Sequence, residues 1–195
     1  MFLPIRTMEY HATIASTNDR VRELLCGANK PKLPCLVIAK QQTAGRGRGD
    51  KRWWSAHGAI LMSLGFEAHR DQLPTLSAST AWSVIDVLSR YLPQHNLEFH
   101  PPNDVYVEGK KICGILLESP TPQYAILGIG LNVNNRISDM SAEYNVDRPI
   151  ASMIDLLDAE TDMHQLVAEL LDTLDSKGQA VNSTLIKESE KCAAK

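Results

Sequence analysis

Residues 42–54 read QTAGRGRGDKRWW, a stretch in which three alternating glycines enclose two arginines and a pair of tryptophans closes the run. Glycine lets backbone N–H groups approach a ligand closely, and arginine presents a planar set of donors that suits carboxylate or phosphate. Tryptophan adds a large apolar surface. This stretch, named here the Gly/Arg loop, therefore favours a loop that wraps around an anion carrying an apolar body.

Two other interpretations compete for the Gly/Arg loop, a flexible linker and an RGG-like RNA-binding segment. Such segments usually repeat in low-complexity tails, whereas this run occurs once, between two apolar runs typical of strands. The formal net charge of −3 also argues against a general nucleic-acid binder. The pattern GxxxxGK[ST] of a P-loop is absent from the sequence. We therefore expect an anion-binding loop and no nucleic-acid partner.

The composition is that of a globular protein, with 44% hydrophobic and 22% charged residues over 195 positions. This length suits one domain with a proper core, and we expect a single domain over residues 1–195. The first six residues are too short and too soon charged for a signal peptide, and no apolar run reaches the length of a membrane span. The cysteines show no CxxC spacing, which argues against a zinc site or disulfide framework; they are Cys26, Cys35, Cys113 and Cys192. We expect a reducing, cytoplasmic setting without membrane contact or a bound metal.

Hydrophobic periodicity predicts strands interleaved with about four helices. Strands are expected over residues 8–15, 35–39, 58–66, 97–100, 105–107, 112–117 and 124–133. Helices are expected over residues 19–26, 74–92 and 151–157, and beyond Asp162, where Gln165 would complete a capping box. Pro101 and Pro102 should end the sheet or mark its edge, because proline removes ladder donors.

Four segments together resemble biotin protein ligases. The Gly/Arg loop with Trp53 is similar to the adenylate-binding loop of that family. Three more segments match in the same order: Ser16-Thr17-Asn18, then Pro102-Asn103-Asp104 with KICGIL at residues 111–116, then GIGLNVN at residues 128–134. One motif alone carries little weight, but an ordered set covering most of the chain is specific.

The resemblance implies an α+β fold, with a mixed, mainly antiparallel sheet and helices packed on one side. Lipoate ligases and class II aminoacyl-tRNA synthetases share this fold. The implied domain is a single catalytic domain. Because the motifs begin at Ser16, no N-terminal DNA-binding domain is expected in this sequence. The family's C-terminal β-barrel module is not expected either, because the stretch after the last motif is too short for it.

The resemblance also implies a two-step reaction. ATP and biotin give biotinyl-5′-AMP and pyrophosphate, with Mg²⁺ on the triphosphate, and a lysine of a biotin carboxyl carrier protein then attacks the mixed anhydride. A homodimer is compatible with the family. Two alternatives are a lipoate- or octanoyl-transferring relative, and a non-catalytic binder of biotin or its adenylate.

Matching positions carry the implied roles. Biotin contacts fall on Ser16, Thr17, Asn18, Gln42, Gly45, Arg46, Gly47, Trp53, Lys111 and Gly114. Nucleotide contacts fall on Arg48, Trp53, Asn103, Asp104 and Asn132, and Arg48 and Lys111 are the catalytic candidates. Read without the family, Ser16 or Thr17 is a helix N-cap and the glycines near Asn132 belong to a buried strand.

Two departures from the family pattern stand out. Arg48 is followed by Gly49-Asp50-Lys51, where the family usually has Arg-Gly-Arg, and this lowers the positive charge of the loop. His100 stands where the family favours lysine, and we expect it near the nucleotide's phosphates.

Overall fold

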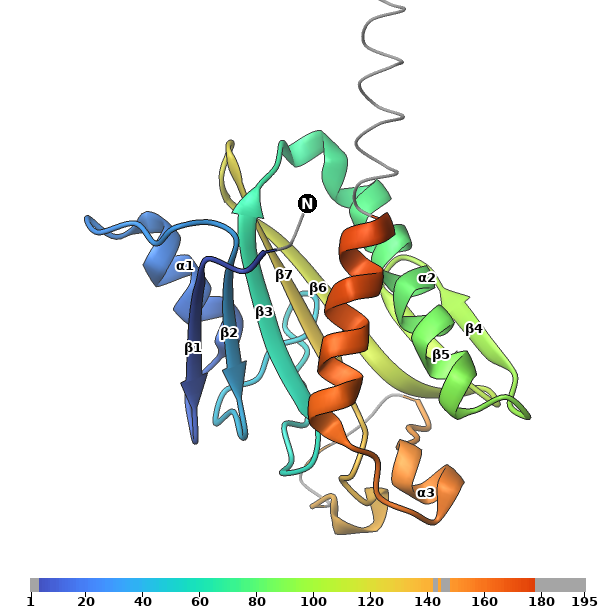
Figure 1. The fold of residues 1–195 in the computed structure, drawn as a ribbon. Coiled ribbons are helices and arrows are strands. Elements are labelled where there is room, and N and C mark those ends of the chain that lie inside the picture. Colours follow the sequence, from blue (N-terminus) through green and yellow to red (C-terminus); the bar gives the residue numbers. More distant parts are fainter. Residues whose placement is uncertain (1–3, 142–143, 145–147, 178–195) are drawn as a thin grey trace, which may run out of the picture.

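A seven-stranded sheet forms the centre of the molecule, seen in a computed structural model that describes residues 4–141, 144 and 148–177 (Figure 1). In spatial order the strands are β1 (Thr7–His11), β2 (Cys35–Ala39), β3 (Ile60–Glu67), β7 (Tyr124–Leu131), β6 (Lys110–Thr121), β5 (Asp104–Val107) and β4 (Leu97–His100). β1 pairs with β2 in parallel, and every other neighbouring pair is antiparallel. The predicted α+β class with a mixed, mainly antiparallel sheet is confirmed.

Four α-helices complete the described fold, with two short 3₁₀ helices at Arg70–Gln72 and Ile137–Asp139. The α-helices are α1 (Thr17–Cys26), α2 (Leu73–Tyr91), α3 (Met153–Leu157) and residues 163–177. Ser16 caps α1 by accepting a hydrogen bond from the Asp19 N–H. Asp162 likewise accepts the N–H groups of His164 and Gln165. The Gln165 side chain donates to Glu169, however, so the reciprocal half of the predicted capping box is not formed.

The sheet buries different helices on its two faces. α2 and residues 163–177 cover one face, where Leu170 and Leu88 pack with alternate strand residues such as Leu36 (Figure 1). α1 lies against the opposite face, where Val21 and Leu25 pack on other strand positions. The expectation of helices on one side therefore holds for α2 and residues 163–177. It does not hold for α1, because side chains alternate along each strand and β2 is apolar on both faces.

Several expectations concern parts of the chain that the structure describes incompletely. Cys26, Cys35 and Cys113 are free cysteines, whereas Cys192 lies outside the described residues. The same applies to the first three residues and to residues 142–143 and 145–147. None of the described helices combines the length and apolar character that a membrane span requires.

Candidate functional site

A cavity of about 910 Å³ lies on the α1 side of the sheet, beneath the Gly/Arg loop. Its size suits a cofactor or small-molecule ligand. The four segments that the sequence singled out meet here, although they are far apart along the chain. The predicted residues that line the cavity are Ser16, Thr17, Asn18, Gln42, Arg46, Gly47, Arg48, Trp53, Asn103, Asp104, Lys111, Gly114 and Asn132.

The Gly/Arg loop forms a short hairpin over this cavity. The Gly47 N–H donates to the Lys51 carbonyl (2.7 Å), and the Trp53 N–H donates to the Gly45 carbonyl (3.0 Å). Gly49 has a φ of +66° at the tip, a conformation that favours glycine. The Gly47 N–H, expected to face the ligand, is thus used within the hairpin. Gly45 does not line the cavity, because it is packed so closely that a Cβ atom there would lie 2.3 Å from Ser55 Oγ.

Trp53 packs against a surface of the sheet that carries no side chains. A Cβ atom at Gly114 or Gly130 would lie 2.8 or 2.5 Å from the Trp53 indole. These glycines therefore make room for the ring between the loop and strands β6 and β7. The Lys111 Nζ lies 5.4 Å from the centre of the Trp53 ring, within reach of a cation–π contact.

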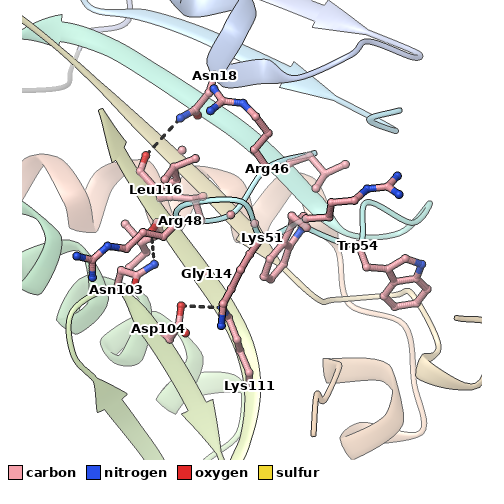
Figure 2. A pocket seen from close by; sticks show the side chains of 18 of the residues that line it. Asn18, Arg46, Arg48, Lys51, Trp54, Asn103, Asp104, Lys111, Gly114 and Leu116 are labelled. Atoms are coloured by element: carbon pink, nitrogen blue, oxygen red, sulfur yellow. Dashed lines mark hydrogen bonds and ion pairs between the residues drawn. The ribbon is translucent and has the colours of Figure 1, made fainter. Parts of the chain in front are cut away.

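Lys111 and Asp104 form a half-buried ion pair at one end of the cavity (Figure 2). Their Nζ and Oδ1 atoms are 2.7 Å apart, and the pair joins neighbouring strands β5 and β6. The Asp104 carboxylate fixes the direction of the Lys111 ammonium group. This end of the cavity thus holds an oriented cation beside an aromatic ring, as attraction of a carboxylate or phosphate requires.

Polar side chains at the start of α1 form the other end of the cavity. The Thr17 N–H and hydroxyl both donate to Gln42 Oε1, at 2.7 and 3.0 Å. Gln42 Nε2 donates to Ser55 Oγ (3.0 Å), so both ends of the Gly/Arg loop are tied to α1. The fully buried Ser63, on β3, donates to Asn18 Oδ1 (2.6 Å). Ser16 acts as the helix cap while also lining the cavity, so the two interpretations of this segment are compatible.

Arg46 does not point at a free anion site but engages two carboxylates. Its guanidinium contacts Asp19 Oδ1 at 2.6 Å and Glu118 Oε2 at 3.2 Å, beside Asn18 (Figure 2). Burial raises the pKa of Glu118, but hydrogen bonds from Asn18 and Arg46 more than offset this effect and leave the pKa below its ordinary value. Sequence reasoning missed Glu118. Strand alternation from Gly114 was the signal that placed it on the same face as the cavity.

Two residues expected to contact the nucleotide use their side-chain amides for hydrogen bonds within the protein. Asn103 Nδ2 donates to the Ile115 carbonyl (2.8 Å). Asn132 is buried, donating to the Ala151 carbonyl (3.0 Å) and accepting from Asn135 (3.1 Å). Both amides thus fix backbone segments around the cavity. Other lining residues that sequence reasoning did not single out are Arg52, Tyr106, Tyr144 and Arg148.

His100 lies behind the cavity wall rather than in it. Its ring stacks on Tyr106, with centroids 3.9 Å apart and planes 13° from parallel. Its Nε2 atom lies 3.1 Å from Glu98 Oε2. The expectation that His100 faces the phosphates is not supported by this geometry, because the Tyr106 ring occupies the cavity side of the stack.

The residues that the structure describes contain no group of three metal-ligating His, Cys, Asp or Glu side chains. Asp104 provides a carboxylate within the cavity. This arrangement fits Mg²⁺ that is carried by a nucleotide, because Mg²⁺ in such sites is held by one or two carboxylates together with substrate phosphates.

Residues 10–132 match the model of the biotin/lipoate A/B protein ligase family. The chain belongs to this family. It is 31% identical over 179 residues to a biotin–[acetyl-CoA-carboxylase] ligase of Mycobacterium tuberculosis, covering 88% of this chain and 64% of that protein. It is 32% identical over 171 residues to the bifunctional ligase/repressor BirA of Bacillus subtilis, covering 84% and 48%. The chain thus spans about half to two thirds of the length of these relatives.

The fold of this family member is shared with solved biotin protein ligases. The enzyme of Aquifex aeolicus in complex with biotin and ATP superposes with a TM-score of 0.73 at 24% identity, covering 89% of this chain and 70% of that one. A bipartite lipoate protein ligase of Thermoplasma acidophilum gives a TM-score of 0.62 at 12% identity, covering 90% and 84%. The family match over residues 10–132 and the sequence relatives confirm the predicted resemblance, and the solved structures show the shared fold.

Proposed function

We propose that this chain is the catalytic domain of an ATP-dependent biotin–protein ligase. It would activate biotin as biotinyl-5′-AMP and transfer it to a lysine of a biotin carboxyl carrier protein. The observation that carries the proposal is the meeting of four ordered motifs around one cavity. Membership of the biotin/lipoate family supports the reaction class, and the identities of 31% and 32% to biotin ligases favour biotin over lipoate.

The two ends of the cavity would bind different parts of biotin, the ureido ring at one end and the carboxylate at the other. The end formed by α1 offers hydroxyl and amide groups of Ser16, Thr17, Asn18 and Gln42, which suit the polar ureido ring of biotin. The Trp53 indole between the ends provides an apolar wall for the rest of the molecule. The biotin carboxylate would then reach the Lys111 end, where the nucleotide also binds.

In the first step, a carboxylate oxygen of biotin attacks the α-phosphorus of ATP and pyrophosphate leaves. Two anions must meet, so cations that offset their repulsion and fix their positions contribute most of the catalysis. Lys111 would neutralise the reacting oxygens, and Arg48 at the loop tip would hold the phosphate. Mg²⁺ on the triphosphate, near Asp104, would offset the charge of the leaving pyrophosphate.

In the second step, the amine of an acceptor lysine attacks the carbonyl carbon of the mixed anhydride and AMP leaves. The hairpin of the Gly/Arg loop lies over the cavity and would shield the anhydride from water until the acceptor arrives. The loop must therefore be held closed during activation and release its product afterwards.

Pyrophosphate release tests this proposal. We expect release that requires both ATP and biotin, with lipoate giving a much lower rate in a parallel reaction. Tight binding of biotin without pyrophosphate release would indicate a non-catalytic binder. Faster release with lipoate than with biotin would assign the chain to the lipoate branch of the family.

A further inference from the structure

Glu118 occupies the centre of a cluster of charged and polar groups next to the cavity. It lies on β6, two residues beyond Leu116, and its side chain is 19% exposed. Oε2 accepts a hydrogen bond from Asn18 Nδ2 at 2.7 Å, and Oε1 accepts from Arg22 at 2.8 Å. Arg46 contacts both oxygens, at 3.3 and 3.2 Å. One carboxylate thus joins a strand, a helix and the Gly/Arg loop.

The charges of this cluster balance within the protein. Arg22 and Arg46 are the two cations, and Asp19 and Glu118 are the two carboxylates. Hydrogen bonds to Glu118 and Asp19 raise the pKa of Arg46 despite its partial burial, so its charge is held by these partners. Removing one member would leave the others with an uncompensated charge.

We infer that Glu118 is a positioning residue of the proposed biotin site, because its carboxylate holds Arg46 of the Gly/Arg loop against Asn18 of α1 and so seats the loop over the cavity. The inference rests on the proposed function. Glu118 does not line the cavity, so it acts through these two residues. Gln42 and Ser55 fix the two ends of the loop, whereas Arg46 fixes its middle.

The hydrogen bond between Glu118 and Asn18 gives the Glu118 carboxylate a second effect, on the position of the Asn18 side chain. Its amide is fixed at both ends, with Nδ2 donating to Glu118 and Oδ1 accepting from Ser63. It lies so close to Gly128 that a Cβ atom there would be 2.2 Å from Oδ1. A shift of the Glu118 carboxylate would therefore disturb both the Gly/Arg loop and Asn18, which is proposed to contact the ureido ring of biotin.

The competing explanation is that Glu118 only anchors α1 to the sheet through Arg22. The chain offers a matched control for this explanation in Glu9, on β1. Glu9 accepts two hydrogen bonds from Arg20 of α1, at 2.8 and 2.9 Å, and it does not touch the Gly/Arg loop. Glu118→Gln and Glu9→Gln each remove one carboxylate that holds an arginine of α1.

Limited trypsin digestion without biotin or ATP provides the first measurement. The loop contains cleavage sites after Arg46, Arg48, Lys51 and Arg52. We expect cleavage of the loop to be about tenfold faster in Glu118→Gln than in the parent, a modest factor because Arg46 is more than a third exposed. Glu9→Gln should be cleaved at the parent rate. Equal acceleration in both variants, or none in Glu118→Gln, would overturn the inference.

Steady-state kinetics and a second variant complete the test. Glu118→Gln should raise the KM for biotin about tenfold and change kcat less than about threefold, because loop seating contributes to binding more than to chemistry.

Arg46→Lys keeps the charge but loses the paired donors, and it should accelerate digestion similarly even if Glu118→Gln does not fold. The variant that combines Glu118→Gln with Arg46→Lys should be digested no faster than either single variant. Additive effects on the digestion rate would contradict coupling between Glu118 and Arg46. Digestion needs no substrate, so failure of biotin activation in the parent would refute the proposed function without deciding the role of Glu118.

Discussion

Lys111 is the residue on which the proposed chemistry depends most. Lys111→Ala should slow biotin-dependent pyrophosphate release roughly 30- to 1,000-fold, because loss of a charge-assisted contact in the transition state costs roughly 2–4 kcal/mol. The free energy of unfolding should fall by about 1 kcal/mol, since the ion pair with Asp104 is partly exposed to solvent, its two side chains being 24% and 22% exposed. Lys110→Ala, which removes the exposed neighbour, is the matched control. Near-parental release by folded Lys111→Ala would exclude this role.

Trp53 is expected to retain the adenylate. Trp53→Ala removes the indole that packs on Gly114 and Gly130, so biotinyl-AMP should escape into solution about tenfold faster or more. Trp82→Ala is the control, because that tryptophan is 50% exposed on α2, away from the cavity. A rapid-quench assay followed by filtration separates released from bound adenylate. If Trp53 only fills the core, the melting temperature will fall while release from the folded fraction stays unchanged.

At the residue scale, motifs predicted which residues line the cavity but not what their atoms contact. Thr17, Gln42 and Lys111 were expected and line it. Arg46 was expected to face an anionic ligand, yet it binds Glu118, which lies 72 positions away in sequence. A long-range ion pair of this kind leaves no local pattern, so it could not be predicted from the sequence.

At the scale of elements, the Gly/Arg loop should respond to ligand. Its hairpin is held by few backbone hydrogen bonds and carries several cations, so anionic biotinyl-AMP should order it. Trypsin digestion between Gly45 and Arg52 should therefore slow several-fold when biotin and ATP are added together. Cleavage elsewhere in the chain serves as the internal reference. Equal digestion of the loop with and without the substrates would show that the loop does not grip the adenylate.

Element boundaries were predictable where the sequence has clear punctuation. β2 and β4 have the expected bounds, because prolines and polar residues flank short apolar runs. β1 ends at His11 rather than at Ala15, because the regular pairing is interrupted there before Ile14 pairs with Gln42 in an isolated parallel bridge. The hairpin within the Gly/Arg loop was not predicted, because glycine-rich sequence is compatible with many turns.

At the scale of the whole molecule, the sheet separates the main hydrophobic core from the cavity of the proposed active site. The main core lies on the face covered by α2 and residues 163–177, and the cavity lies on the opposite face. Leu170→Ala should therefore cost about 2–5 kcal/mol of stability, because Leu170 is fully buried. The folded fraction should keep the parental KM for biotin. A change in KM as large as that expected for Glu118→Gln would show that the two faces are coupled.

Strand and helix patterns predicted strands interleaved with helices, and the family resemblance supplied the α+β class, but neither indicated the side of the sheet on which α1 packs. Val21 and Leu25 predict an apolar helix face without indicating which surface receives it. That choice depends on strand pairing between distant segments, such as β3 with β7. The pairing of β6 with β7 sets Gly114 opposite Gly130 under Trp53 and thereby creates the site.

The central claim is that this cavity joins biotin to AMP, and direct detection of the product tests it most sharply. The protein is incubated with ATP, Mg²⁺ and biotin, passed through a desalting column, and the protein fraction is analysed by mass spectrometry. We predict biotinyl-5′-AMP in that fraction, close to one molecule per active chain, and its near-absence with Lys111→Ala. Bound biotin and intact ATP without the adenylate, from a protein that melts cooperatively, would contradict the account.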